Sequence, residues 1–133
     1  MDFDMDLAKD ESKNNPYFYA QYAYVRCCSI LAKSSFNPED EISFEEIDNC
    51  YEIVSKAINY PSILKEYALE RSPHSLVHFV KDFSATFHSF YEQNPVLSDD
   101  KITSNSRLLI TCITKLILKN SFKILNVKPL EKV

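Results

Sequence analysis

Apolar residues recur at helical spacing in several stretches of the chain. Residues 44–58 carry one such stripe and residues 73–93 carry a longer one. Because an α-helix has 3.6 residues per turn, positions three or four apart lie on one face, so both stretches are predicted to be amphipathic helices. The predicted buried face of the first is Phe44, Ile47, Tyr51, Val54 and Ile58, and that of the second is Leu76, Phe79, Val80, Phe83, Phe87 and Phe90.

Capping residues and prolines set the expected ends of the helices. Asn15 followed by Pro16 is typical of a helix start. Ser43 with Glu46 three residues later has the pattern of a capping box. Further prolines at positions 61 and 95 are expected to interrupt helices. The fold class predicted is all-α, a five-helix bundle, with helices at about residues 16–33, 44–59, 62–70, 73–93 and 104–125.

Composition supports one globular domain and excludes several kinds of site. The chain has 133 residues, of which 45% are hydrophobic, enough for a single core. Glycine is absent, which excludes the glycine-rich phosphate loop and the dinucleotide-binding fingerprint. No apolar run approaches the roughly 20 residues that span a bilayer, and the acidic N-terminus has no signal-peptide pattern. We therefore expect a cytoplasmic protein with no membrane contact.

Cysteine and histidine spacing does not predict a metal site. Cys27 and Cys28 are adjacent, whereas the other two cysteines are isolated, and a zinc site needs paired ligands at short spacing. We expect buried, reduced thiols. His74 and His78 have the spacing of a metal-binding pair, but no third ligand lies nearby in the sequence, so no metal is predicted.

Charge is distributed unevenly along the chain. Residues 1–100 hold 18 acidic and 8 basic residues, a sum of −10, whereas residues 101–133 hold 1 acidic and 7 basic residues, a sum of +6. A local positive field can attract phosphate although the whole molecule is negative. The alternative is a solvated lysine face on an amphipathic helix. The lysines in question are Lys115, Lys119, Lys123, Lys128 and Lys132.

The first predicted helix carries aromatic rings and cations along one edge. With about 100° per residue and Tyr19 at zero, Tyr22 falls at about 300°, Arg26 at about 340° and Lys33 at about 320°. Tyr24 falls on the other side, near 140°. A neighbouring face is left for the core, and the residues expected there are Phe18, Val25, Cys28 and Ala32.

Rings beside a planar cation are typical of sites that stack unpaired RNA bases. Each stacked base contributes on the order of 1–3 kcal/mol, and nearby positive charges hold the phosphates. The alternative is that Tyr19 and Tyr22 are half-buried packing residues. Spacing alone favours this second interpretation.

A family resemblance covers nearly the whole chain. The stretch "NPYFYAQYAYVRCCSIL" resembles the opening helix of the C-terminal, DALR-type anticodon-binding domain of arginyl-tRNA synthetases, a class I family. "PHSLVHFVKDFSATFHSFYEQNPVL" is similar to that domain's aromatic helix, and "RLLITCITKLILKNSFKILNVKPLEKV" to its last helix and tail. "DFDMDLAK" resembles the stretch that leads in from the catalytic part. The resemblance implies a lead-in at residues 1–14 and an anticodon-binding domain at 15–133.

The resemblance also implies a function and its residues. The chain would bind the anticodon loop of arginine tRNA as a fragment of an arginine–tRNA ligase, pack against that enzyme's catalytic domain and be monomeric. ATP and magnesium would belong to the parent enzyme, and this fragment would have no catalytic site and no cofactor. The RNA-binding residues implied or predicted are Tyr19, Tyr22, Arg26, Lys33, Lys132 and Val133. The alternative function is a helical protein–protein interaction module that does not bind RNA.

Three positions depart from the family pattern. Tyr24 stands where the family usually has histidine, so no role of that histidine is carried over. Val133 lacks the long side chain usual at the last position, which weakens the expected terminal contact. Asn126 stands where glycine is frequent after the last helix. Asparagine is the best non-glycine residue for a left-handed helix end, so that turn is expected to survive.

Overall fold

The computed structural model describes residues 17–37, 39–70, 73–96 and 98–129, and the regular secondary structure in these ranges is entirely helical. The predicted all-α fold class is therefore confirmed. Six helical segments are described, because the predicted second helix is divided in two. They are α2 (Phe18–Ala32), α3 (Phe44–Asn49), α4 (Tyr51–Ile58), α5 (Tyr60–Glu70), α6 (His74–Gln93) and α7 (Lys101–Leu125).

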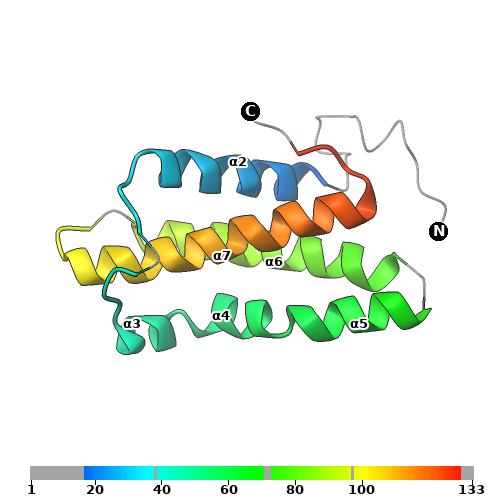
Figure 1. Ribbon diagram of the computed structural model, residues 1–133, viewed down its shortest axis with the longest axis horizontal. Coiled ribbons are helices and arrows are strands. Elements are labelled where there is room, and N and C mark those ends of the chain that lie inside the picture. The colour runs from blue at the N-terminus through cyan, green and yellow to red at the C-terminus, as the bar shows by residue number, and fades with distance from the viewer. Residues whose placement is uncertain (1–16, 38, 71–72, 97, 130–133) are drawn as a thin grey trace.

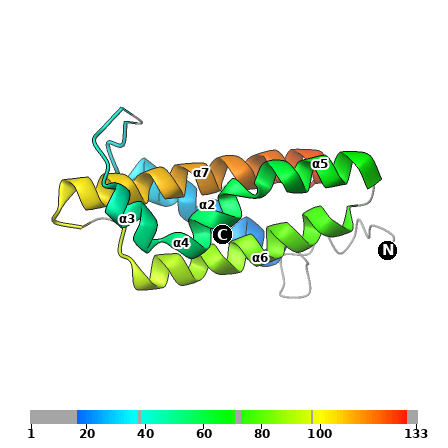
Figure 2. The same cartoon turned by 90° about the horizontal axis from the view of Figure 1, so that it is seen from below.

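The helices form an elongated bundle of three layers. The two longest helices, α6 and α7, make the middle layer (Figures 1 and 2). Helix α2 covers one side of this layer and packs on both α7 and α6. The shorter helices α3, α4 and α5 follow one another along the opposite side. The core consequently lies around α6 and α7, and α2 has an outer edge that faces solvent.

The apolar stripe of α6 is confirmed as the centre of the core. Phe83 and Phe87 are completely buried, and the Phe79 and Phe83 rings stack with centroids 5.3 Å apart. The other predicted members of the stripe are buried as well. Burial of such side chains stabilises the fold by about 1.5–3 kcal/mol each relative to exposure, so this stripe is a principal source of stability.

The predicted core face of α2 is wrong. Ala32 is exposed, and Phe18, Val25 and Cys28 are only partly buried. The core face is turned toward α6 and α7, and Tyr24 lies in it with its ring 5.9 Å from that of Phe122. Helical arithmetic gives the angles between side chains but not which of two adjoining faces meets the neighbouring helices. The buried residues are Ala20, Gln21, Ala23, Tyr24, Cys27 and Ile30.

The predicted apolar face of residues 44–58 is wrong at three of its five positions. The helix is interrupted at Cys50, which has φ −98° and ψ 37°. The two helices turn an adjoining face toward the core, so that Phe44, Tyr51 and Ile58 are 78%, 72% and 73% exposed. Ile53, outside the predicted stripe, is instead 1% exposed. Ile47 and Val54 pack against the core only partly.

The predicted capping box at Ser43 is half formed. The Ser43 hydroxyl accepts a hydrogen bond from the Glu46 backbone N–H at 3.2 Å. In a full capping box the Glu46 side chain would accept from the Ser43 N–H. Here the Ser43 N–H donates to the Ser106 hydroxyl at 2.8 Å instead, and the Glu46 carboxylate accepts from Arg107. The start of α3 is thereby fastened to α7. The predicted helix start at Asn15 lies outside the described residues.

Helix α7 begins three residues earlier than predicted and ends as predicted. Asp100 caps its start by accepting from the Ile102 N–H at 3.1 Å. Asn126 adopts the left-handed conformation, with φ 58° and ψ 39°. The Val127 N–H then donates to the Phe122 carbonyl at 2.8 Å, the bond of a Schellman-type helix end.

Within the described ranges, no helix combines the length and apolar character needed to cross a bilayer. The four cysteines all lie in these ranges and are free thiols. Cys27 and Cys50 are buried as predicted, and burial raises the pKa of both. Cys28 and Cys112 are only partly buried.

Candidate functional site

Three of the predicted residues, two in α2 and one at its C-terminal cap, line one surface cavity. Tyr22, Arg26 and Lys33 border a space of about 480 Å³, with Tyr22 and Arg26 half-buried and Lys33 exposed. Tyr19, nearly one turn earlier, is 53% exposed and does not line the cavity. The predicted stripe is therefore present along the outer edge of α2, and three of its four members share a concave surface.

The opposite wall comes from another part of the chain. Tyr91, near the end of α6, lies there with Pro95 and Val96 of the segment that joins α6 to α7. The charged residues among the described ones that line the cavity are Arg26 and Lys33, both positive. The remaining lining residues belong to α2 and are Val25, Ser29 and Ile30.

Arg26 lies between two aromatic rings. Its guanidinium carbon is 4.9 Å from the centroid of the Tyr22 ring and 4.4 Å from that of the Tyr91 ring. Its Nη2 also donates to the Tyr22 hydroxyl at 3.2 Å. At such distances the attraction of a cation to each ring is about 0.5–2 kcal/mol, so the two rings help to hold the guanidinium in place beside the cavity.

Sequence reasoning missed the role of Tyr91. A signal for it was available, because Tyr91 follows the last phenylalanine of the buried α6 stripe and so lies off that face. It also shares a helix edge with His88, three residues earlier. The sequence could not predict that Tyr91 contacts Arg26 of α2, because the two residues are far apart in the chain.

His88 of α6 contacts the edge of α2 that carries Tyr19 and Tyr22. Its Nε2 is 3.2 Å from the Tyr19 carbonyl and its Nδ1 is 3.5 Å from Arg26 Nη1. A carbonyl only accepts, so Nε2 carries the proton and Nδ1 accepts from Arg26. Burial, and then the nearby Arg26 charge, lower the pKa of His88, opposed by its bond to the Tyr19 carbonyl. The ring centroids of Tyr19 and Tyr22 lie 6.5 Å and 5.5 Å from it.

The segment after α7 returns to α2. The Gln21 side chain is buried and donates from Nε2 to the Lys128 carbonyl at 3.2 Å. Gln21 is next to Tyr22 in the sequence, so the bond fixes the chain near the candidate site. The predicted contacts of Lys132 and Val133 lie outside the described residues.

The lysines of α7 form a spaced row. Lys115 is half-buried, whereas Lys119 and Lys123 are exposed. Their four-residue spacing places them on one side of α7. Helix α7 packs against α2, so this row belongs to a helix adjoining the one that carries the rings. The predicted role of these lysines in holding phosphate stays a prediction.

Among the described residues, no group of three or more potential metal ligands lies together. The charged and aromatic groups instead make a cavity suited to a planar ligand that carries negative charge. Tyrosine faces and a guanidinium can stack on flat rings, and Arg26 and Lys33 can neutralise anionic oxygens. Nucleotides combine both features, so the site fits them by chemistry.

Comparisons with known proteins identify related chains. Residues 20–133 match the family model described as the DALR anticodon binding domain. The chain is 33% identical to the arginine–tRNA ligase of Halorhodospira halophila over 135 residues. That match covers 96% of this chain but 23% of the relative. For the arginine–tRNA ligase of Staphylococcus epidermidis (strain ATCC 12228 / FDA PCI 1200) the identity is 31%, with 99% and 25% covered.

A solved structure has the same fold. It is a Campylobacter jejuni protein described as an arginyl-tRNA synthetase, with a TM-score of 0.74 and 22% sequence identity. The match covers 98% of this chain and 29% of that one. The chain thus spans about a quarter of the length of the curated relatives it matches.

Proposed function

The chain belongs to the DALR anticodon binding domain family, and from this premise we propose that it binds the anticodon loop of arginine tRNA as one domain of a class I arginine–tRNA ligase. The parent enzyme would join arginine to tRNA with ATP and magnesium, bound in its catalytic part. This chain would contribute recognition, as a monomeric unit in the cytoplasm that packs against the catalytic domain.

The arrangement of Tyr22, Arg26 and Tyr91 carries the proposal. Two rings flank a guanidinium at the edge of a cavity of about 480 Å³. An unstacked base of the opened loop would lie against these groups, and a second would stack on the exposed ring of Tyr19. Base–aromatic stacking contributes about 1–3 kcal/mol per base, independently of the identity of the base.

Selectivity would come from polar groups around the cavity. Every arginine codon has guanine in the middle, so every arginine anticodon has a central cytosine. Cytosine presents an amino donor, which hydroxyl and carbonyl oxygens accept. The hydroxyls of Tyr22 and Ser29 belong to residues that line the cavity and are candidate acceptors for this amino group.

Positive side chains would hold the backbone of the loop. Lys33 lines the cavity, Lys119 and Lys123 are exposed on α7, and the predicted contacts of Lys132 and Val133 would close the site at the chain end. Neutralising phosphates releases counterions, so the affinity should fall as the salt concentration rises.

A Tyr22→Ala substitution tests the stacking proposal. We expect the dissociation constant for arginine tRNA, measured by electrophoretic mobility shift, to rise roughly 5- to 150-fold, the equivalent of one lost stacked base. The matched control is Tyr51→Ala, which removes a tyrosine that is 72% exposed on α4. Circular dichroism checks that both variants are folded. If folded Tyr22→Ala binds arginine tRNA as tightly as the wild type does, the proposal is contradicted.

A second experiment separates RNA recognition from a protein–protein interaction module. Affinity is measured at several salt concentrations for arginine tRNA and for the same tRNA with its central anticodon cytosine replaced. The proposal expects a negative salt slope and weaker binding of the altered tRNA. No binding of either RNA would favour the interaction module, whereas equal binding of both would contradict recognition of the central cytosine.

A further inference from the structure

The wall of the cavity opposite α2 depends on the segment that joins α6 to α7. Pro95 and Val96 of this segment line the cavity, and Val96 is 3% exposed, so its side chain is buried in the bundle. The separation between this wall and Tyr22, Arg26 and Lys33 sets the width of the space available to a ligand. Whatever holds Pro95 and Val96 in place therefore controls the shape of the site.

Local hydrogen bonds hold the two ends of this segment. At the first end, the Asn94 backbone N–H and side-chain Nδ2 both donate to the Phe90 carbonyl, at 2.9 Å and 3.0 Å. At the other end, the Ser104 hydroxyl accepts from the Ser98 N–H at 2.7 Å and donates to the Ser98 carbonyl at 3.0 Å. Asp100 then caps α7. These bonds are all made within a few residues.

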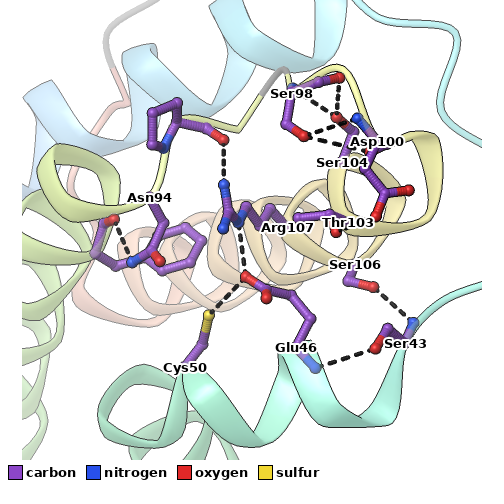
Figure 3. Close-up of polar contacts among 12 residues, drawn as sticks. Ser43, Glu46, Cys50, Asn94, Ser98, Asp100, Thr103, Ser104, Ser106 and Arg107 are labelled. Carbon is purple, nitrogen blue, oxygen red and sulfur yellow. Dashed lines mark hydrogen bonds and ion pairs between the residues drawn. The ribbon is translucent and has the colours of Figure 1, made fainter.

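Arg107 of α7, 12 residues further along the chain, holds Pro95. Its Nη1 donates to the Pro95 carbonyl at 2.7 Å, and its Nε donates to Glu46 Oε1 at 2.7 Å (Figure 3). The Arg107 and Glu46 side chains are 16% and 14% exposed, so water screens the pair only weakly. Proline has no N–H, and its carbonyl is therefore the one backbone group through which Pro95 can be fixed.

We propose that Arg107 is a positioning residue for RNA binding. It does not line the cavity; it acts through the Pro95 carbonyl and sets the position of the Pro95–Val96 wall. Arginine suits this task, because its planar fork donates in two fixed directions, to the carboxylate and to the carbonyl. The inference rests on the proposed function, since the affinity that it modulates is that for arginine tRNA.

A purely structural role is the competing explanation, because the Arg107–Glu46 ion pair also joins α3 to α7. Two substitutions separate the roles. Arg107→Lys keeps a positive charge opposite Glu46, but its single nitrogen cannot reproduce both directions of the guanidinium. Glu46→Gln weakens the ion pair and leaves an acceptor for Nε, so the bond to Pro95 is retained.

The 133-residue chain is titrated with arginine tRNA by mobility shift, well below the melting temperature of each variant. We expect Arg107→Lys to raise the dissociation constant about 5- to 10-fold, the equivalent of one weakened charge-assisted hydrogen bond. Glu46→Gln should stay within about twofold of the wild type, because the Pro95 contact is kept. Equal affinity of Arg107→Lys and the wild type would overturn the inference.

Lys56→Met is the control for stability. Lys56 also bridges two helices, with an ion pair to Asp82 at 2.9 Å and a hydrogen bond to the Thr86 hydroxyl at 2.7 Å, but neither it nor its partners line the cavity. This variant should lose thermal stability and keep its tRNA affinity. If it loses affinity in proportion to stability, as Arg107→Lys does, the effect of Arg107 is structural and the inference fails.

A double-mutant cycle with Tyr22→Ala measures whether the affinity losses of the two substitutions are coupled. A purely structural role of Arg107 predicts no such coupling. If Arg107 acts through the cavity, Arg107→Lys should cost less affinity in the Tyr22→Ala background than in the wild type. Additive losses would overturn the inference. Failure of the proposed function is distinguishable, because Tyr22→Ala alone would then leave tRNA affinity unchanged.

Discussion

His88 lies between Tyr19 and Arg26, and its two ring nitrogens have opposite roles. Nε2 donates to a carbonyl and Nδ1 accepts from a guanidinium, so this arrangement requires the neutral ring. Protonation would place an N–H on Nδ1 opposite the positive Arg26. Burial and Arg26 lower the pKa of His88, whereas the Tyr19 carbonyl and Glu92 act in the opposite direction.

The free energy of unfolding should therefore depend on pH through His88. The unfolded chain binds this proton at a pKa of about 6.5, and the folded chain binds it only at lower pH. Between the two values the unfolded state holds more protons, so stability is fully present above about pH 6.5 and is lost as pH falls toward the folded pKa. Urea denaturation of the wild type at pH 7.5 and pH 5.5 should show this loss.

His88→Gln should show a smaller loss of stability over the same pH interval. Its control is His78→Gln, which replaces an exposed histidine of the same helix and should behave as the wild type does. Equal pH dependence in His88→Gln and the wild type would show that His88 is not the group responsible.

At the scale of elements, the face that α3 and α4 turn toward the core decides which side chains stabilise the fold. Phe44, Tyr51 and Ile58 are exposed, whereas Ile53 is buried, and the two helices are separated at Cys50. Two features hold α3 in its own direction: the Ser43–Ser106 hydrogen bond and the Glu46–Arg107 ion pair. Both come from α7, more than 60 residues along the chain.

Alanine substitutions at Ile53 and Ile58 test this register. Ile53→Ala should lower the free energy of unfolding by about 2–5 kcal/mol, because it opens a cavity in the core. Ile58→Ala removes the same atoms from a side chain that is 73% exposed. It should change the free energy of unfolding by no more than about 0.5 kcal/mol. Chemical denaturation measures both values, and similar losses in the two variants would contradict the structure.

At the scale of the whole molecule, charge is separated between regions. The net charge is −4, although residues 101–133 sum to +6. Attraction of RNA would then depend on local fields near α7 rather than on the net charge.

Replacing Lys119 and Lys123 together by glutamine tests this arrangement. The slope of log affinity against log salt for arginine tRNA should become shallower by about 0.7 for each lysine that contacts single-stranded phosphate. Replacing Lys65 and Lys81, exposed lysines of α5 and α6, changes the net charge equally and should leave the slope unchanged. Equal effects of the two double substitutions would indicate a net-charge effect.

The sequence by itself determined the features that depend on neighbouring residues. The buried stripe of α6 follows from helical periodicity, and the left-handed turn at Asn126 follows from the conformational preference of asparagine. The shared edge of Tyr19, Tyr22, Arg26 and Lys33 likewise needs only the angle between successive residues of a helix. Such features are local, so periodicity and capping rules predict them.

Only the tertiary structure decided which faces meet. It turned a different side of α2 toward the core, interrupted the helix at Cys50, and brought Tyr91 and His88 of α6 against Arg26. These outcomes depend on packing and hydrogen bonds between segments that are far apart in the chain. A local pattern contains no information on such contacts, and they give the cavity its second wall.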